Sequence, residues 1–496
     1  MVLFLKVRFY YYDTLVLSLK YILESFKIKK ICCIGAGYVG GPTMAVIAEK
    51  CPHLKVTVVD INEERIDEWN SSDLEKMPIF EPGLKEIISK VRGKNLFFST
   101  QIAKEIKESD MVFISVNTPT KTEGFGAGYA IDLKWVESSA RQVAKYAQEH
   151  TIVVEKSTLP VKTAEVIKEI LLNSIKNKNC KDYDKTFSIL SNPEFLAEGT
   201  AIQNLQNPDR VLIGGEDQES INYLKEIYMN WVKSTKILTT NLWSSELSKL
   251  TANAFLAQRI SSINSISAIC EVTGAEVGEV SKAVGFDSRI GSEFLSAGPG
   301  FGGSCFKKDI LNLVYLAKFY RLNEIADYWE QVIKLNNWQN RRISQLIVEK
   351  LFGTVSLKKI VILGFSFKAN TNDTRESPAI SIVNDLLENG AEIKIHDPKV
   401  KSKQIMKDLN LSFNTKEKSK EFGSWDYVSD VYKALENADA AVIVTEWPEY
   451  KKLDWLKISE IMRNPAWLFD TRSITDPTEI KETSINYWSV GNGSLE

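Results

Sequence analysis

The strongest constraint on the fold is a glycine-rich motif that lies between a short apolar run and a helical stretch. The motif Gly-Ala-Gly-Tyr-Val-Gly occupies residues 35–40, directly after the apolar residues 30–34. A helical pattern over residues 42–50 follows, and a second apolar run, 55–59, ends at Asp60. This order is typical of a parallel sheet with helices on both faces. Strands buried on both faces have continuous apolar runs rather than alternating ones.

The spacing of the glycines gives this motif a chemical role. Gly35 permits a tight turn, Gly37 lets the backbone approach a pyrophosphate, and Gly40 lets the helix pack closely on the strand. The N-terminus of that helix faces the phosphate charge. Asp60 is placed to accept a hydrogen bond from a ribose 2′-hydroxyl and to repel a 2′-phosphate, which favours NAD over NADP. Arg65 is a residue type that could hold a 2′-phosphate, and a glycine turn without a ligand is the alternative interpretation.

The same order of elements returns near the C-terminus. Residues 358–364 repeat the pattern of residues 29–35, and residues 392–397 repeat the strand that ends at Asp60. Further strands are expected at residues 111–116, 151–155, 187–190 and 211–213. We therefore predict an α/β protein with two Rossmann-like doubly wound parallel-sheet domains. The second of these lacks the glycine motif and should not bind a second dinucleotide in the same way.

The central segment has a different pattern. Leu247, Leu250, Ala254 and Ala257 recur at helical spacing, and residues 244–273 contain neither glycine nor proline. This predicts a long central helix that joins the two Rossmann-like domains. The predicted domains are an extension at 1–27, an NAD-binding domain at 28–240, a central helical domain at 241–352, and a second Rossmann-like domain at 353–496.

Composition narrows the classes of partner. The chain has 62 basic and 64 acidic residues, a balance that indicates neither nucleic acid nor a membrane surface. Its three histidines and six cysteines show no metal-ligand spacing, so we expect no metal, and a reducing, cytoplasmic compartment. Residues 1–27 fit neither a signal peptide nor a membrane span. We expect them to lie outside the fold, with a short amphipathic anchor as the alternative.

The most informative segment is Gly-Pro-Gly-Phe-Gly-Gly-Ser-Cys at residues 298–305. It delivers Cys305 to the start of a helical pattern, where the helix N-terminus and the neighbouring Lys307 and Lys308 favour the thiolate. Asp309 lies four residues later, on the same helix face. A thiolate beside a carboxylate suits covalent acyl or thiohemiacetal chemistry. A buried structural cysteine is the alternative.

Other polar residues are expected near this chemistry. Residues 116–120, 155–158 and 192–199 each follow a predicted strand, and ligands gather at the carboxyl ends of strands in open α/β sheets. Lys249 and Asn253 are four residues apart and share one face of the central helix. Taken alone, that pair could equally be part of a solvated helix face.

These motifs together resemble the nucleotide-sugar dehydrogenases of the UDP-glucose/GDP-mannose dehydrogenase family, and within it those that oxidise UDP-glucose. The resemblance runs over residues 28–472 and rests on residues 35–40, 116–120, 192–199 and 302–306 and on Lys249 with Asn253. It implies a two-step, four-electron, NAD-dependent oxidation of UDP-glucose to UDP-glucuronate through a cysteine thiohemiacetal and thioester. It also implies that domain 353–496 binds the UDP-sugar and that the central helical segment is a dimerisation segment. The implied assembly is a homodimer, with a hexamer as the larger assembly.

The resemblance implies a catalytic set made up of Cys305, Lys249, Asp309, Glu194, Asn253 and Thr158. Cys305 would be the nucleophile, Lys249 would stabilise the oxyanion, and Asn253 would hold the sugar oxygen. Asp309 would orient Lys249 and the hydrolytic water. Glu194, positioned by Thr158, would be the general base towards that water.

The binding residues follow from the same resemblance. The cofactor set is Gly35, Gly37, Tyr38, Val39, Gly40, Asp60, Arg65, Val116, Asn117, Thr118, Thr120, Ser157, Thr158, Glu198, Cys305 and Lys308. The substrate set is Glu194, Phe195, Leu196, Lys249, Asn253, Arg289, Phe294, Leu295, Phe301, Gly302, Phe367, Lys368 and Arg472. Arg289 would be offered across the dimer interface, and Lys368 and Arg472 would reach the diphosphate and the sugar.

Three other functions stay open on the sequence. The nearest is another nucleotide-sugar dehydrogenase, for UDP-N-acetylmannosamine or GDP-mannose, because the substrate loops rather than the motifs decide the sugar. The second is a single-step NAD-dependent dehydrogenase, which would not need Cys305. The third is an inert NAD-binding scaffold, which would need neither Cys305 nor Lys249.

Overall fold

The computed structural model describes residues 27–176, 185–410 and 423–493. Within it, the chain forms two compact units. The first unit contains the residues up to Pro119 together with Ile131–Lys249, and the second contains Thr120–Ala130 together with the residues from Leu250 onward. The predicted N-terminal extension, apart from Lys27, and Cys180 lie outside the described residues.

The first unit is built on an eight-stranded sheet with the order β3-β2-β1-β4-β5-β6-β7-β8. Its strands are β1 Lys30–Ile34, β2 Lys55–Val59, β3 Leu96–Ser99, β4 Met111–Ile114, β5 Thr151–Glu155, β6 Phe187–Ser191, β7 Val211–Gly215 and β8 Ile237–Thr240. Neighbouring strands are parallel except for β6 and β7, which pair antiparallel. An antiparallel neighbour needs no return crossover, so the chain reverses between β6 and β7.

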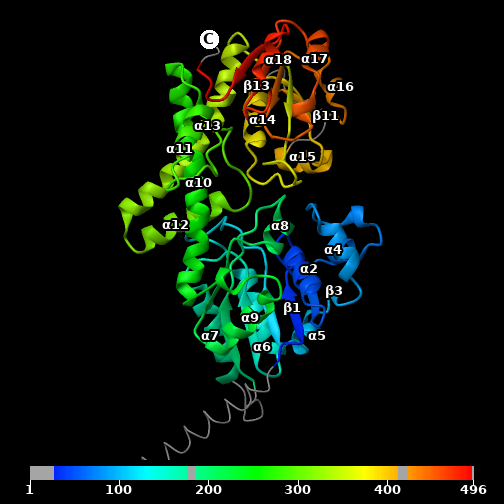
Figure 1. Cartoon of the computed structure of the whole chain (residues 1–496), viewed down its shortest axis with the longest axis vertical. Helices are drawn as coiled ribbons and strands as arrows, with labels where there is room; N and C mark the ends of the chain where they lie inside the picture. The colour runs from blue at the N-terminus through cyan, green and yellow to red at the C-terminus, as the bar shows by residue number, and fades with distance from the viewer. Residues whose placement is uncertain (1–26, 177–184, 411–422, 494–496) are drawn as a thin grey trace, which may run out of the picture. The chain divides into compact units, whose positions relative to one another are not determined.

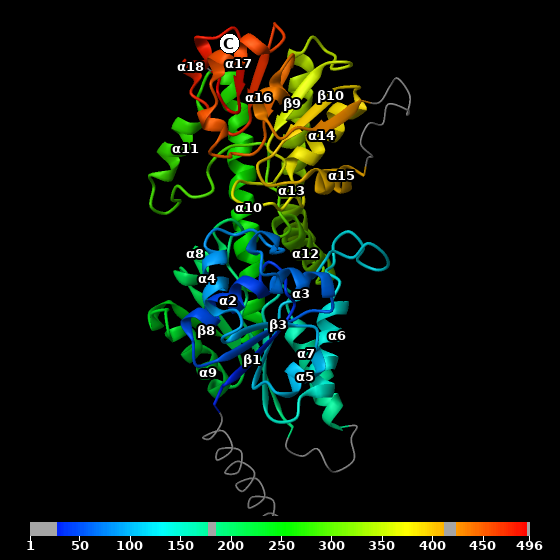
Figure 2. The same ribbon diagram turned by 90° about the vertical axis from the view of Figure 1, so that its right-hand side faces the viewer.

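Helices cover both faces of this sheet. They are α2 Gly40–Lys50, α3 Glu63–Asn70, α4 Leu84–Val91, α5 Ile102–Lys107, α6 Lys134–Tyr146, α7 Thr163–Lys176, α8 Ala201–Gln206 and α9 Gln218–Met229. Ile31 and Cys33 pack in one core cluster with residues of α2 and α4, whereas Cys32 and Ile34 pack in another with α6 and α7. Figure 2 shows α5, α6 and α7 together on one side. The doubly wound arrangement is therefore confirmed.

The second unit carries a six-stranded, fully parallel sheet with the order β11-β10-β9-β12-β13-β14. Its strands are β9 Lys359–Leu363, β10 Glu392–His396, β11 Ser424–Tyr427, β12 Ala440–Ile443, β13 Trp467–Asp470 and β14 Asn486–Ser489. Its flanking helices are α14 Pro378–Glu388, α15 Ser402–Leu409, α16 Val431–Leu435, α17 Trp455–Ile461 and α18 Pro477–Lys481. The predicted second Rossmann-like sheet is thus confirmed.

Four further helices lie between the two sheets in the sequence: α10 Leu242–Thr273, α11 Val277–Gly285, α12 Phe306–Phe319 and α13 Asn323–Lys350. The predicted central helix is α10, which begins at Leu242 rather than at residue 244 and runs on without interruption (Figure 1). It contributes its first turns to the first unit and the rest to the second, so it joins the two sheet-bearing parts.

The apolar stripe on α10 is only partly buried. Leu250, Ala254 and Ala257 are fully buried, as their spacing predicts, but 41% of Leu247 is exposed. Nowhere in the described ranges does a helix combine the length and the apolarity that crossing a membrane requires.

Candidate active site

The glycine turn after β1 fits a dinucleotide. Gly35 has φ +112°, and a Cβ atom there would lie 2.2 Å from the carbonyl oxygen of Ser115. Any other residue at this turn would therefore be strained and would clash. At Gly37 the opposite holds, because no heavy atom lies within 4 Å of the Cβ position. The open backbone at Gly37 is what the close approach of a pyrophosphate requires.

Asp60, at the carboxyl end of β2, is held against the glycine turn. Its Oδ2 accepts a hydrogen bond from the backbone N–H of Ala36 at 2.8 Å, and its Oδ1 accepts one from Asn62 at 3.0 Å. The carboxylate is partly exposed, so it can still accept from a ribose hydroxyl. Arg65 lies in the first turn of α3 and is exposed. The Asp60 carboxylate therefore fits the adenosine ribose of NAD.

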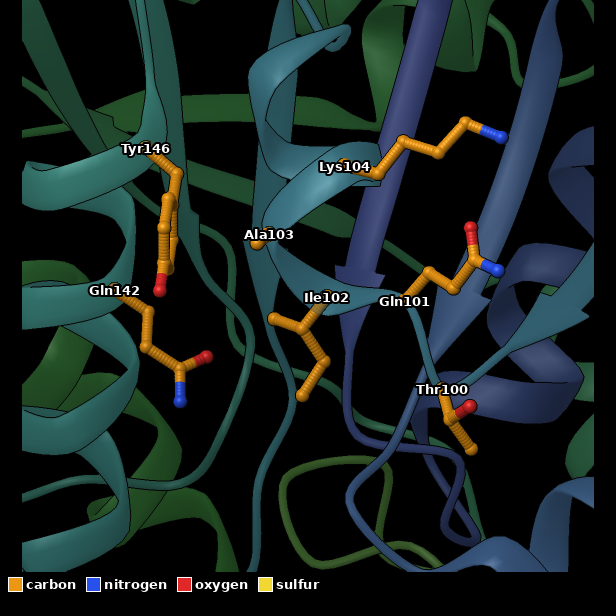
Figure 3. A pocket seen from close by; sticks show the side chains of 7 residues that line it. All are labelled: Thr100, Gln101, Ile102, Ala103, Lys104, Gln142 and Tyr146. Atoms are coloured by element: carbon orange, nitrogen blue, oxygen red, sulfur yellow. The ribbon is translucent and has the colours of Figure 1, made fainter.

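A shallow groove of about 450 Å³ lies between α5 and α6 of the same unit. Figure 3 shows its lining, which consists of Thr100, Gln101, Ile102, Ala103, Lys104, Gln142 and Tyr146. It begins directly after β3, and the carbonyl of Ser99 at the end of β3 accepts the N–H of Asp60 at 3.3 Å. The groove therefore flanks the part of the first unit in which the adenosine ribose is expected.

The polar loops of the first unit share one edge of its sheet. Strands β1, β4, β5 and β6 are consecutive neighbours and run parallel. Their carboxyl ends therefore lie side by side, and they are followed by residues 35–40, 116–118, 156–158 and 192–198 respectively. Within this unit the structure thus brings together the loops that the sequence analysis selected.

Glu194 follows β6 and is held by an ion pair that the sequence analysis missed. Its Oε2 lies 2.8 Å from Nζ of Lys156, and its Oε1 accepts from the backbone N–H groups of Phe195 and Leu196. Thr158 is joined by its carbonyl to the Thr118 hydroxyl, at 3.1 Å. In the part of the chain that the structure describes, Lys156 is the side chain that holds the Glu194 carboxylate.

Lys156 is almost fully buried and makes two more polar contacts. Its Nζ donates to Oδ1 of Asn192 at 3.1 Å and to the hydroxyl of Tyr228 at 3.3 Å. Burial alone would lower the pKa of Lys156, but the nearby Glu194 and Tyr228 outweigh it and raise that pKa above the ordinary value. The lysine is therefore charged. The sequence signal for this role was a lysine directly after a predicted strand, within the selected segment 155–158.

Lys249, in the first turns of α10, is buried rather than solvated, with 6% exposure. Its Nζ lies 5.4 Å from the centroid of the Phe195 ring, and the guanidinium of Arg210 lies 3.9 Å from the same ring. Asn253, one turn later on α10, is buried as well. The alternative interpretation of a solvated helix face is therefore wrong.

In the second unit, Cys305 stands at the N-cap of α12, half-buried, with Sγ 3.5 Å from Oγ of Ser304. Asp309 is fully buried, and its backbone N–H donates to the carbonyl of Cys305 at 2.9 Å. The Asp309 Oδ2 accepts a hydrogen bond from Nδ2 of Asn253 at 2.6 Å. The predicted nucleophile, carboxylate and amide thus belong to one connected cluster of this unit.

The loop before Cys305 carries an aromatic group. The rings of Phe301 and Phe306 meet edge to face with centroids 5.8 Å apart, and Phe294 approaches Phe306 at 6.4 Å. Leu295 and Phe301 are buried, whereas Phe294 is exposed.

The basic residues of the second unit differ in their surroundings. Arg472 donates from Nε to the carbonyl of Val444 at 2.7 Å and from Nη2 to the carbonyl of Phe367 at 3.2 Å. Lys368 Nζ lies 5.6 Å from the centroid of the Phe367 ring. Arg289 is exposed and pairs with Asp287 at 2.6 Å, so its guanidinium stays at the surface of this chain.

Comparison with known proteins identifies this arrangement. Residues 29–232 match the NAD binding domain of the UDP-glucose/GDP-mannose dehydrogenase family, residues 243–338 its central domain, and residues 361–477 its UDP binding domain. The chain belongs to this family. It is an NAD-dependent oxidoreductase, as the sequence predicts, and its UDP-sugar binding domain is the C-terminal Rossmann-like part.

Relatives of this dehydrogenase family match along nearly their whole length. The chain is 54% identical to UDP-glucose 6-dehydrogenase 3 of Oryza sativa subsp. japonica, over 93% of this chain and 97% of that one. It is 55% identical to UDP-glucose 6-dehydrogenase of Drosophila melanogaster, over 93% and 96%. A solved UDP-glucose dehydrogenase from the archaeon Pyrobaculum islandicum shares the fold at TM-score 0.80 and 28% identity, over 94% and 98%.

The predicted site residues of this dehydrogenase are distributed over both units. The first unit carries Gly35, Gly37, Tyr38, Val39, Gly40, Asp60, Arg65, Val116, Asn117, Thr118, Ser157, Thr158, Glu194, Phe195, Leu196, Glu198 and Lys249. The second unit carries Thr120, Asn253, Arg289, Phe294, Leu295, Phe301, Gly302, Cys305, Lys308, Asp309, Phe367, Lys368 and Arg472. Their roles in the reaction stay predictions.

Proposed function

We propose that this chain oxidises C6 of UDP-glucose twice and releases UDP-glucuronate. The observation that carries the proposal is Cys305, a half-buried thiol at the N-terminus of α12 with the buried Asp309–Asn253 pair one turn away. A single alcohol-to-aldehyde oxidation has no use for such a nucleophile, whereas oxidation to the acid does. NAD, when bound, accepts the hydride removed at each oxidation.

In the first oxidation, C6 of the alcohol loses a hydride to NAD and its hydroxyl loses a proton to a water molecule, which gives an aldehyde. Lys249 and Asn253 bind the C6 oxygen in this proposal. A buried ammonium stabilises the oxygen as negative charge develops on it, more strongly than the same group would in water. Both side chains are nearly excluded from solvent, which supports this role.

In the second oxidation, Sγ of the Cys305 thiolate forms a bond to C6 of the aldehyde and makes a thiohemiacetal. Loss of a hydride from that adduct leaves a thioester. Glu194 then takes a proton from a water molecule, whose oxygen attacks the thioester carbon. The C–S bond breaks, the thiolate is restored, and the carboxylate product leaves. The ion pair with Lys156 supports this role, because it orients the Glu194 carboxylate.

The nucleotide end of the substrate belongs to the C-terminal domain in this proposal. Lys368 and Arg472 bind the diphosphate and the sugar, and the anchoring of Arg472 by two backbone carbonyls supports a fixed guanidinium there.

A homodimer, in the cytoplasm, is part of the same proposal, with a hexamer as the larger assembly. The helix α10 exposes Phe255, Ile269 and Val272 in a single chain, and large exposed apolar side chains on one helix indicate an interaction surface. Arg289 would be offered to the second copy.

A different sugar nucleotide is the second candidate. A solved UDP-D-ManNAc dehydrogenase from Pyrococcus horikoshii has the same fold at TM-score 0.76 and 26% identity. The fold alone therefore does not distinguish between sugar nucleotides. The 54% identity to UDP-glucose 6-dehydrogenases favours UDP-glucose as the substrate.

The test is the amount of NADH formed for each UDP-glucose consumed by the purified chain. Two NADH per UDP-glucose, with UDP-glucuronate as the product, is the expected result. One NADH per UDP-glucose, with an aldehyde released, would overturn the covalent mechanism. Turnover of UDP-N-acetylmannosamine or GDP-mannose in preference to UDP-glucose would overturn the substrate.

A further inference from the structure

The loop that precedes Cys305 is held by the side-chain amides of two helices. On α13, Asn336 binds both backbone groups of Phe301, because its Oδ1 accepts from the N–H at 2.8 Å and its Nδ2 donates to the carbonyl at 3.1 Å. Gln339 donates from Nε2 to the carbonyl of Gly298 at 2.9 Å. On α10, Oδ1 of Asn264 accepts from the N–H of Gly298, also at 2.9 Å.

These four bonds satisfy the main chain at two loop positions. Asn264 and Gln339 are fully buried and Asn336 is 6% exposed, so water cannot replace the bonds that they make. A buried amide without a partner costs about 1–3 kcal/mol, and both the side chain and the loop backbone would lose theirs together. These side-chain amides therefore satisfy the backbone N–H and C=O groups of the loop, as a neighbouring strand does in a sheet.

The backbone of the loop lies directly against these amides. Gly300 has φ +123°, and a Cβ atom there would lie 2.8 Å from Oδ1 of Asn336 and 2.6 Å from Oδ1 of Asn340. Only glycine leaves room for this contact. The close approach of these two amides therefore requires glycine at position 300.

We infer that Asn336, Gln339 and Asn264 are positioning residues of this enzyme, and we call them the amide clamp. The clamp fixes residues 298–301 from both sides, and Cys305 follows four residues later at the start of α12. Since the clamp binds only main-chain atoms, it leaves the loop side chains free to vary. It acts on the loop that would line the sugar pocket, and in this respect it depends on the proposed function.

The test uses Asn336→Asp. An ionised aspartate keeps the acceptor for the N–H of Phe301 but has no donor for its carbonyl. Position 336 is buried and faces the Phe301 carbonyl, which raises the pKa of the aspartate, and its protonated form restores that donor. We expect the KM for UDP-glucose to rise about tenfold at pH 8.5 and to return towards the wild-type value at pH 6, with the KM for NAD unchanged. Charged groups near the loop include Arg472, which pairs with Glu446 at 3.1 Å, and the Arg342–Glu271 pair. Both arginines stay charged over this range.

The matched control is Asn337→Asp, the same change on the exposed neighbouring residue, which should leave both KM values unchanged. Asn336→Leu removes both bonds, so its defect should not recover at low pH. If Asn336→Asp does not fold, Gln339→Glu serves instead. It loses only the bond to Gly298, keeps the acceptor for Arg342 at 3.2 Å, and should raise the KM about threefold.

Hydrogen exchange gives a readout that does not depend on catalysis. In Asn336→Asp at pH 8.5, the amides of residues 298–304 should exchange faster than in the Asn337→Asp control. Equal exchange and equal KM values in the two variants would overturn the clamp. If the wild type does not oxidise UDP-glucose, the proposed function fails, whereas the exchange measurement still decides the clamp.

Discussion

Lys156 Nζ lies 2.8 Å from Oε2 of Glu194, and only 3% and 14% of the two side chains reach solvent. The cation also contacts Tyr228 and Asn192, so the carboxylate is one corner of a buried polar network. Networks of this kind hold each member in one orientation. Glu194 is thereby fixed beside the end of β6, where the proposed mechanism needs a base.

The first prediction concerns Glu194→Gln. Glutamine keeps the size of the side chain but cannot accept a proton from water, so thioester hydrolysis should be the step that fails. Stopped-flow measurement should show a burst of up to two NADH per active site and then a slow steady state. The control is Glu169→Gln on the exposed face of α7, which should behave as wild type. Normal steady-state turnover by Glu194→Gln would move the base role to another residue.

The second prediction concerns Lys156→Met. Removal of one partner of a buried ion pair leaves an uncompensated charge, which costs about 3–5 kcal/mol. The midpoint of thermal unfolding should fall clearly, and Glu194→Gln in the same chain should restore part of the loss. Additive losses in the double variant would show that the two side chains do not interact.

The pKa of Lys156 fixes the pH range for that comparison. Glu194 and Tyr228 outweigh burial and raise this pKa in the folded state. A raised lysine pKa gives stability that is fully present below the ordinary value and is lost only as the pH rises through the folded pKa. Between pH 6 and pH 9 the difference in stability between wild type and Lys156→Met should therefore not depend on the titration of this lysine.

The sequence predicted the sheet centres better than the sheet edges. The strands expected at 30–34, 55–59 and 151–155 match β1, β2 and β5 residue for residue, because central parallel strands are continuous apolar runs. The strands β3, β8, β11, β13 and β14 were not predicted. All of them except β13 lie at the edge of a sheet, where a short run is set by pairing with a neighbour rather than by its own pattern.

The candidate site also has residues that the sequence predicts and contacts that it does not. Gly37, Asp60 and Cys305 could be selected because each belongs to a motif in which spacing carries the chemistry. The contacts of Lys156 and of the amide clamp could not be predicted, since the partners lie 38 residues (Glu194) and 35 residues (Phe301, to Asn336) away in the sequence. Contacts of that range become visible only in the folded chain.

The third prediction concerns Asp60→Asn. Asparagine keeps an acceptor for the N–H of Ala36 but loses the negative charge that repels a 2′-phosphate. The preference for NAD over NADP, measured as the ratio of the two kcat/KM values, should fall about tenfold, as expected for loss of one charge–charge interaction. Asp67→Asn, at an exposed position of α3, is the control and should keep the wild-type ratio. An unchanged ratio in Asp60→Asn would assign the discrimination to Arg65.

The fourth prediction concerns two buried carboxyl groups of the first unit, Glu155 and Glu246. Glu246 accepts from the backbone N–H groups of Lys162 and Ala164, at 2.7 and 2.8 Å, and its carboxyl group acts electrostatically on that of Glu155. Burial, and then the charge of Glu246, raise the pKa of Glu155 well above its ordinary value. Burial also raises the pKa of Glu246, but its two backbone donors oppose that rise, so we expect Glu155 to hold the proton.

An acid whose pKa is raised on folding stabilises the native state at low pH and loses that contribution as the pH rises through the folded pKa. Glu155→Gln cannot ionise, so its thermal midpoint relative to wild type should increase from pH 5 to pH 9. Thermal unfolding across this range checks it, with Glu169→Gln as the exposed control. A difference that stays constant with pH would mean that Glu155 is ionised in the folded chain.

The fifth prediction is the loss of the second oxidation in Cys305→Ser. Serine is nearly isosteric, so folding and the binding of UDP-glucose should survive. Its hydroxyl is a far poorer nucleophile than a thiolate at neutral pH, and the ester that it would form hydrolyses slowly. We expect the steady-state rate to fall at least about 10³-fold, which corresponds to roughly 4 kcal/mol in the barrier.

The first oxidation does not use the thiol, so Cys305→Ser should still form NADH once, with bound aldehyde or a covalent ester accumulating on the protein. Intact-protein mass spectrometry after incubation with UDP-glucose and NAD detects the ester, and trapping with an amine reagent detects the aldehyde. Ser304→Ala is the control, because its hydroxyl contacts the thiol at 3.5 Å without taking part in the bond changes. Near-normal production of UDP-glucuronate by Cys305→Ser would rule out a thioester, since no other group of the proposed set can form one.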